Sequence, residues 1–196
     1  MLNKENIKEL LKIKGEVRGM NLKSDFNFVL EKGGKEAVKK IEKIMEDLGF
    51  SLKKEEIRPM DFYPLGWGTV FLLVIKDFFN FDENDIEEWG KSIVKFSLIT
   101  KIFMSYYVAF GPFQKETSRI WTRYYTVGDL EFVEYDTKKK IGRLILKDFN
   151  IHPIYCSLLR GYFSKVCEML IKTTPKCEET KCFFKGGDYH EFLFTW

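Results

Sequence analysis

The spacing of apolar and polar residues predicts a mainly helical first half. An amphipathic helix is expected over residues 33–48, where apolar side chains recur at helical spacing between flanking glycines. Residues 21–31 before it are expected to be a short strand or extended segment. A weaker helix is expected over 1–13, with an apolar side for dimer contacts. Residues 70–79 are apolar enough for either a buried helix or a buried strand, and the helix is favoured.

A long helix is predicted to begin at Asp82, because aspartate favours the N-cap position. Apolar and aromatic residues recur on one of its faces as far as Tyr107, a stripe typical of core packing. A break at Gly111 and Pro112 is followed by a short helix over 117–125.

The last third of the chain has a different pattern. Residues 129–135 and 141–149 alternate like paired strands joined by a basic turn. Pro153 suits the first turn of a helix that runs to residue 171. A second hairpin is predicted from 182–185 and 189–196.

These elements predict an α+β fold in which helices flank an antiparallel β-sheet. We expect one domain over residues 1–196 with an N-terminal helical extension, and a hairpin, helix and hairpin over 129–196.

Composition narrows the function classes. The 32 Lys and Arg nearly balance the 29 Asp and Glu and are interspersed with them, so a nucleic-acid partner is not expected. No apolar run has the length of a membrane span, and the start lacks a secretory signal, so we expect a cytoplasmic protein. In a reducing compartment, the four cysteines favour metal, packing or redox roles over disulfides.

A candidate metal site stands out near the C-terminus. It combines two thiols, a carboxylate and an imidazole from Cys156, Glu179, Cys182 and His190. This donor set suits tetrahedral zinc, and four protein ligands leave no position for a catalytic water. We therefore expect a structural zinc ion.

Spacing alone leaves one ligand open. Cys177 could replace Glu179, because a thiolate is the softer ligand. Strict alternation would place Glu179 and Cys182 on opposite faces of a strand, so a zinc site requires a loop or bulge between them. Cys167 lies three helical turns from Cys156 and is expected to be a core residue.

The C-terminal part resembles the 4-vinyl reductase domain family, in which Cys, Glu, Cys and a final Cys surround zinc. The matching residues are Cys156, Gly161, Tyr162, Glu179, Cys182, Gly186 and His190. His190 stands where the family has its last cysteine, and imidazole is an equally good zinc ligand. The resemblance favours Glu179 over Cys177.

That family is similar in fold to vesicle-tethering TRAPP subunits and to haem nitric-oxide-binding domains. The resemblance implies a homodimer and an apolar pocket for a small hydrophobic or aromatic molecule. Aromatic character and helical phase give these pocket candidates: Phe103, Tyr107, Trp121, Tyr124 and Phe163.

Three functions follow from the resemblance. The first is a ligand-binding sensor or carrier with structural zinc. The second is a vinyl-group reductase of tetrapyrrole metabolism, although no dinucleotide fingerprint or iron–sulfur motif supplies an electron source. The third is a tethering or interaction module.

Overall fold

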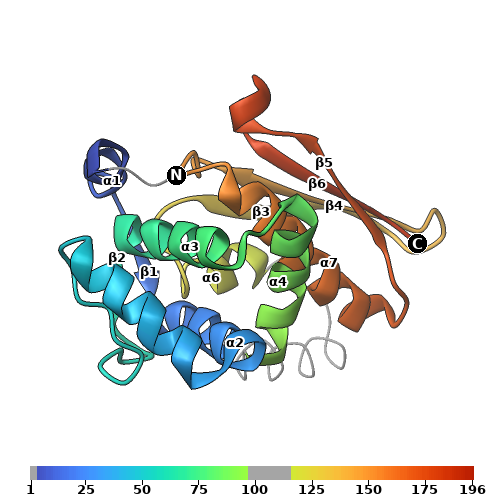
Figure 1. Ribbon diagram of the computed structural model, residues 1–196. Coiled ribbons are helices and arrows are strands. Elements are labelled where there is room, and N and C mark those ends of the chain that lie inside the picture. Colours follow the sequence, from blue (N-terminus) through green and yellow to red (C-terminus); the bar gives the residue numbers. More distant parts are fainter. Residues whose placement is uncertain (1–3, 97–115) are drawn as a thin grey trace. The chain divides into compact units, whose positions relative to one another are not determined.

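The computed structural model describes residues 4–96 and 116–196, which divide into two compact units (Figure 1). Unit 1 consists of the described residues up to Asp85 together with Tyr124–Thr126, and unit 2 consists of the others. All four cysteines and both histidines of the chain belong to unit 2. Unit 2 therefore carries the candidate chemistry.

Unit 1 is mainly helical. Its elements are α1 (Lys4–Leu10), β1 (Glu16–Arg18), α2 (Gly19–Asp47), β2 (Phe62–Pro64) and α3 (Leu65–Phe79). The two short strands pair antiparallel, and the rings of Phe26 and Phe71 pack 4.4 Å apart between α2 and α3. The predicted helix over 70–79 is confirmed as part of α3.

The start of α2 corrects the sequence prediction. Residues 21–31 are helical, and the expected strand was wrong. Leu22, Phe26 and Val29 are buried at helical spacing, so burial of this face outweighs the local preference for an extended segment. Gly34, at φ 70° and ψ −173°, forms a kink inside α2 in place of the predicted helix start.

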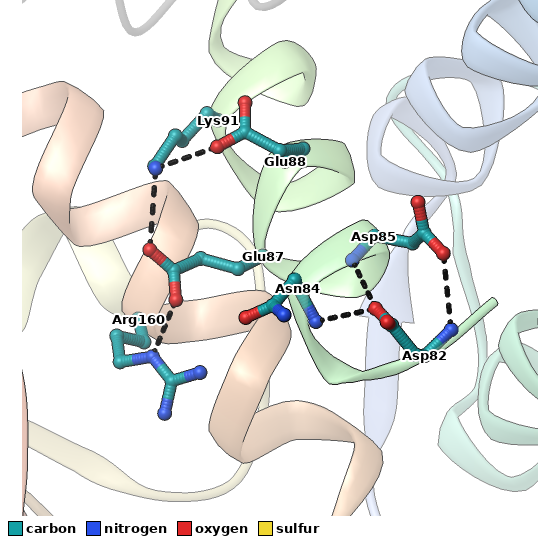
Figure 2. A network of polar contacts seen from close by, with 7 residues as sticks. All are labelled: Asp82, Asn84, Asp85, Glu87, Glu88, Lys91 and Arg160. Carbon is teal, nitrogen blue, oxygen red and sulfur yellow. Dashed lines mark hydrogen bonds and ion pairs between the residues drawn. The ribbon is translucent and has the colours of Figure 1, made fainter.

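Unit 2 contains an antiparallel sheet and its helices. The elements are α4 (Glu83–Phe96), α6 (Thr117–Trp121), β3 (Asp129–Asp136), β4 (Ile141–Lys147), α7 (Ile154–Ile171), β5 (Lys176–Lys181), the 3₁₀ turn η2 (Phe183–Lys185) and β6 (His190–Thr195). The first turn of α4 belongs to unit 1, and the rest of that helix, from Ile86 onward, belongs to unit 2. Asp82 caps α4 as predicted, since its Oδ1 accepts hydrogen bonds from the amides of Asn84 and Asp85 (Figure 2). The expected extension of this helix to Tyr107 lies outside the described residues.

The sheet has the strand order β3-β4-β6-β5, with every pair antiparallel. Leu144 lies opposite Phe192 and Leu146 opposite His190, and all four are buried. α7 lies along this face (Figure 1), and Phe163 of α7 packs its ring 5.1 Å from that of Phe192. The predicted fold class, an antiparallel sheet with flanking helices, is confirmed.

The final hairpin begins earlier than the sequence predicts. The first strand is β5, and residues 182–185 form a turn, so the strand prediction there was wrong. The carbonyl of Cys182 accepts hydrogen bonds from the amides of Lys185 and Gly187. This turn reverses the chain between β5 and β6 and places Cys182 at its first position.

Helices α4 and α7 cross at very close range. A Cβ added at Gly161 would overlap the carbonyl oxygen of Glu87, and one added at Gly90 would overlap that of Leu158. The Glu87 carboxylate accepts a 2.7 Å hydrogen bond from Nε of Arg160 and lies 3.2 Å from Nζ of Lys91 (Figure 2). Burial opposes ionisation here, but these two cations lower the pKa of Glu87.

No helix among the described residues is both long and apolar enough to cross a membrane.

Candidate metal site

Three segments of unit 2 bring four potential metal ligands together. Cys156 lies in the first turn of α7, Glu179 in β5, Cys182 at the start of η2 and His190 at the start of β6. One ligand atom from each residue lies within 4.8 Å of all the others. The four residues expected from the sequence are therefore neighbours in space.

A β-bulge makes this meeting possible. The pairing of β5 with β6 shifts register between Glu179 and Lys181, so one extra residue, Thr180, interrupts the alternation. Glu179 and Cys182 can then point to the same side of the hairpin. The sequence required such an irregularity, and the structure has it at this position.

The spacing of the donor atoms is close to that of a tetrahedral site. Bonds of about 2.3 Å to sulfur and about 2.0 Å to nitrogen give tetrahedron edges of about 3.8 Å between two sulfurs and about 3.5 Å between sulfur and nitrogen. The Sγ atoms of Cys156 and Cys182 are 3.5 Å apart, and Sγ of Cys156 is 4.0 Å from Nδ1 of His190. Nδ1 of His190 lies 2.9 Å from Oε1 of Glu179. The largest separation in the group is within 4.8 Å, so shifts of about 1 Å or less would bring the four atoms around one ion.

The second nitrogen of His190 faces a backbone acceptor. Nε2 lies 3.3 Å from the carbonyl oxygen of Phe149, which can only accept, so a proton on Nε2 would be donated to it. In that tautomer the lone pair of Nδ1 faces the other three residues of the cluster, as metal binding requires. A backbone carbonyl that orients a ligating histidine is a common outer-shell feature of metal sites. Sequence reasoning missed Phe149, because any residue type can supply a carbonyl.

Burial makes the cluster unfavourable for uncompensated negative charge. The side chains of His190 and Glu179 are 5% and 4% exposed. Burial, then the Glu179 carboxylate and the neighbouring Cys182 thiol, raise the pKa of the Cys156 thiol far above its usual value. Two thiolates and a carboxylate in this position therefore need a cation.

The other two cysteines lie outside the cluster. Burial raises the pKa of Cys167 to about 12, as for a thiol that serves as a small core side chain. Cys177 pairs with Phe194 in the sheet, and burial raises its pKa as well. The four-residue group contains Glu179 and not Cys177.

The predicted pocket residues are in several places. Trp121 donates a hydrogen bond from Nε1 to the Val127 carbonyl, and Phe163 packs in the core under the sheet. Tyr124 is buried in unit 1, where its carbonyl accepts a hydrogen bond from the Arg18 amide. Phe103 and Tyr107 lie outside the described residues.

Comparison with known proteins gives a fold relationship only. Neither a protein-family model nor a curated protein matches the sequence. An H-NOX protein from S. oneidensis in the Fe(II)NO ligation state has a TM-score of 0.67 at 9% identity, covering 90% of this chain and 97% of that one. The chain has the fold of an H-NOX domain.

Two further structures give the same result. Unliganded Fe(II) H-NOX from K. algicida has a TM-score of 0.60 at 14% identity, covering 91% of this chain and 95% of that one. A third structure, described in terms of heme redox potential modulated by porphyrin distortion, has a TM-score of 0.63 at 11% identity. The match covers 91% of this chain and 99% of that one. The expected likeness to haem nitric-oxide-binding domains is confirmed, whereas membership of the 4-vinyl reductase family is not shown.

The expectation of zinc as the cofactor is contradicted by these neighbours. They are H-NOX domains, described with Fe(II) and heme and not with zinc. The physical reason for the error is that thiolate, imidazole and carboxylate ligands suit several first-row metals, so the donor set does not single out zinc.

Haem, the group that the H-NOX fold implies, does not fit the described residues. The chain has two histidines: His190 is part of the cluster, and Nδ1 of His152 accepts a hydrogen bond from the Ile154 amide. Cys156 and Cys182 belong to the cluster, Cys167 is buried, and Cys177 is half-buried in β5. Histidine and cysteine are the commonest protein ligands of haem iron; three of these six residues are gathered in the cluster, and a hollow beside His190, at about 120 Å³, is too small for haem.

Proposed function

We propose that this protein is a small-molecule sensor domain in which Cys156, Glu179, Cys182 and His190 hold a metal ion. The observation that carries the proposal is the convergence of four donor atoms, from three chain segments, within 4.8 Å. The H-NOX fold supports the sensor role, because its solved members include a complex with nitric oxide.

The metal would act as a structural link. It would join the first turn of α7 to the end of β5 and the start of β6, two strands that already pair in the sheet. All four positions of a tetrahedral ion would be filled by protein, which leaves none for a reacting water. The metal would therefore stabilise this end of unit 2 and take no part in catalysis.

The sensor proposal includes a small apolar ligand and a homodimer. Native mass spectrometry of freshly purified protein tests both, through a co-purified molecule and the mass of the assembly. A monomer without ligand, seen in several preparations, would contradict these two parts of the proposal.

Metal analysis tests the site directly. Purified protein should contain about one transition-metal ion per chain, and the stripped protein should bind Co²⁺ with the visible absorption of a tetrahedral thiolate site. Cys182→Ala should abolish both. When the free ion is present at about 100 times its Kd, loss of binding lowers the free energy of unfolding by about 2.7 kcal/mol. For a chain of this size, this corresponds to a fall in Tm of roughly 5–10 °C.

Cys167→Ala is the matched control. It removes the same atom from a buried position on α7, where the residue is 7% exposed and outside the cluster. Metal content should be unchanged in this variant. Equal metal loss in both variants, or a metal-free protein that does not bind Co²⁺, would overturn the proposal.

A further inference from the structure

A hollow of about 120 Å³ adjoins the candidate metal site, because His190 and Phe149, whose carbonyl lies 3.3 Å from Nε2 of His190, both line it. It is formed by the end of β4 with the turn that follows, by η2 and by the start of β6. Its lining consists of Leu146, Asp148, Phe149, Asn150, Phe183, Asp188, Tyr189 and His190. Pockets for drug-sized ligands usually begin at about 300 Å³, so this one suits a small molecule or a single side chain.

The lining combines negative charge with aromatic rings. Asp148 and Asp188 supply carboxylates from two different turns, and Phe149, Phe183 and Tyr189 supply ring surfaces. Carboxylates beside aromatic rings are the chemistry by which proteins bind organic ammonium groups. The ring of Tyr189 is already engaged by Lys181, whose Nζ lies 4.7 Å from the ring centroid and donates a 2.6 Å hydrogen bond to the Tyr189 hydroxyl. Phe149 and Phe183 therefore supply the ring surfaces for an added ammonium group.

We infer that this hollow binds the ammonium group of a small organic amine and that the amine is coupled to the metal site. The coupling rests on the proposed function; the binding itself does not. Phe149 lines the hollow and its carbonyl orients His190, while Phe183 directly follows Cys182. An occupant would thus contact the supports of two metal ligands.

Butylammonium is the probe for a free amine, and the peptide Gly-Lys-Gly is the probe for a lysine side chain. Calorimetric titration of the metal-loaded protein should show saturable binding of at least one of them. Butanol and butyrate, which have similar size but lack the positive charge, should bind at least 10-fold more weakly. Tighter binding of the peptide would identify a protein lysine as the source of the ammonium group, and tighter binding of butylammonium a free amine.

Asp148→Asn and Asp188→Asn should each weaken the preferred amine about 10-fold. Glu131→Gln is the control, because Glu131 is a carboxylate of the same sheet that pairs with Lys147 and does not line the hollow. Circular dichroism should show that all three variants remain folded. Equal binding of amine and butanol, or no effect of either aspartate substitution, would overturn the inference.

The coupling has its own readout. Saturating amine should change the Co²⁺ absorption spectrum and shift Co²⁺ affinity by the same factor by which Co²⁺ shifts amine affinity. Bound Co²⁺ with no amine binding would overturn this inference and leave the proposed function intact. Amine binding to a protein that holds no metal would support the hollow and overturn the proposed function.

Discussion

At the residue scale, the choice of the fourth metal ligand depends on the geometry of β5. Cys177 and Glu179 are two residues apart on one strand and share a face, which separates them by about 7 Å along the strand. Of the two, Glu179 belongs to the four-residue group and Cys177 does not. The 2.9 Å contact between Glu179 and Nδ1 of His190 places the carboxylate at the cluster.

Glu179→Gln should weaken Co²⁺ binding by about 100-fold or more, because a neutral amide replaces a charged ligand and outer-shell substitutions alone cost about 10–100-fold. Cys177→Ser is the control and should leave the Co²⁺ affinity unchanged. Competition with a chromophoric chelator measures both affinities. The reverse order of effects would assign the fourth position to Cys177.

The residues of the candidate metal cluster could be found from the sequence because their types are rare and chemically distinctive. Two of the four cysteines and one of the two histidines belong to the cluster. A shared site for Glu179 and Cys182 required a bulge or loop between them, but only the strand register shows that the bulge is at Thr180. The Phe149 carbonyl and the hollow around it had no sequence signal, since backbone groups and cavity shape depend on tertiary packing.

At the element scale, the crossing of α4 and α7 depends on two glycines. Gly161→Ala should destabilise the protein by about 1–3 kcal/mol or more, because the new methyl group would overlap the Glu87 carbonyl and force the helices apart. Urea unfolding measures the change. Lys165→Ala, on the partly exposed side of α7, should cost less than about 1 kcal/mol. If both variants lost a similar amount of unfolding free energy, the close helix crossing would not be the cause of the destabilisation by Gly161→Ala.

The ion pair at the same crossing predicts a pH dependence. Arg160 and Lys91 lower the folded-state pKa of Glu87 below its ordinary value of 4.5. This stabilisation is present above about pH 4.5 and is lost as the pH falls through the lower folded-state value. Glu87→Gln should therefore reduce the loss of unfolding free energy on acidification.

Glu88→Gln is the control for this pH effect, because the Glu88 side chain is 71% exposed on the same helix. Its unfolding free energy should follow the wild-type curve between pH 6 and pH 3, measured by urea denaturation. If Glu87→Gln also followed the wild-type curve, Glu87 would make no net contribution to the acid sensitivity of the fold.

The elements that the sequence predicted correctly are those with strong local signals. The helix of residues 154–171 begins beside Pro153, and the hairpin of β3 and β4 has alternating strands around a polar turn. The errors occurred where tertiary packing decides. Residues 21–31 form helix because their apolar face is buried, and β5 was missed because its polar, half-exposed sequence has little strand signal.

At the scale of the whole molecule, the H-NOX fold and the chain's own residues point to different chemistry. Solved H-NOX structures are described with Fe(II) and heme. Here one of the two histidines and two of the four cysteines are at the candidate metal cluster, and the others lie elsewhere in unit 2. Similarity of fold at 8–14% identity does not carry a cofactor with it, because cofactor binding depends on particular side chains.

This difference predicts that the purified protein does not form a stoichiometric haem complex. Titration with hemin, in the oxidised and the reduced state, should give the spectrum of free haem with no sharpened Soret band. His152→Ala and His190→Ala should leave that spectrum unchanged, because a protein that does not bind haem has no axial histidine to lose. A one-to-one complex that is lost in either variant would show that a histidine binds the haem iron. A complex that survives both substitutions would place the iron on a ligand other than histidine.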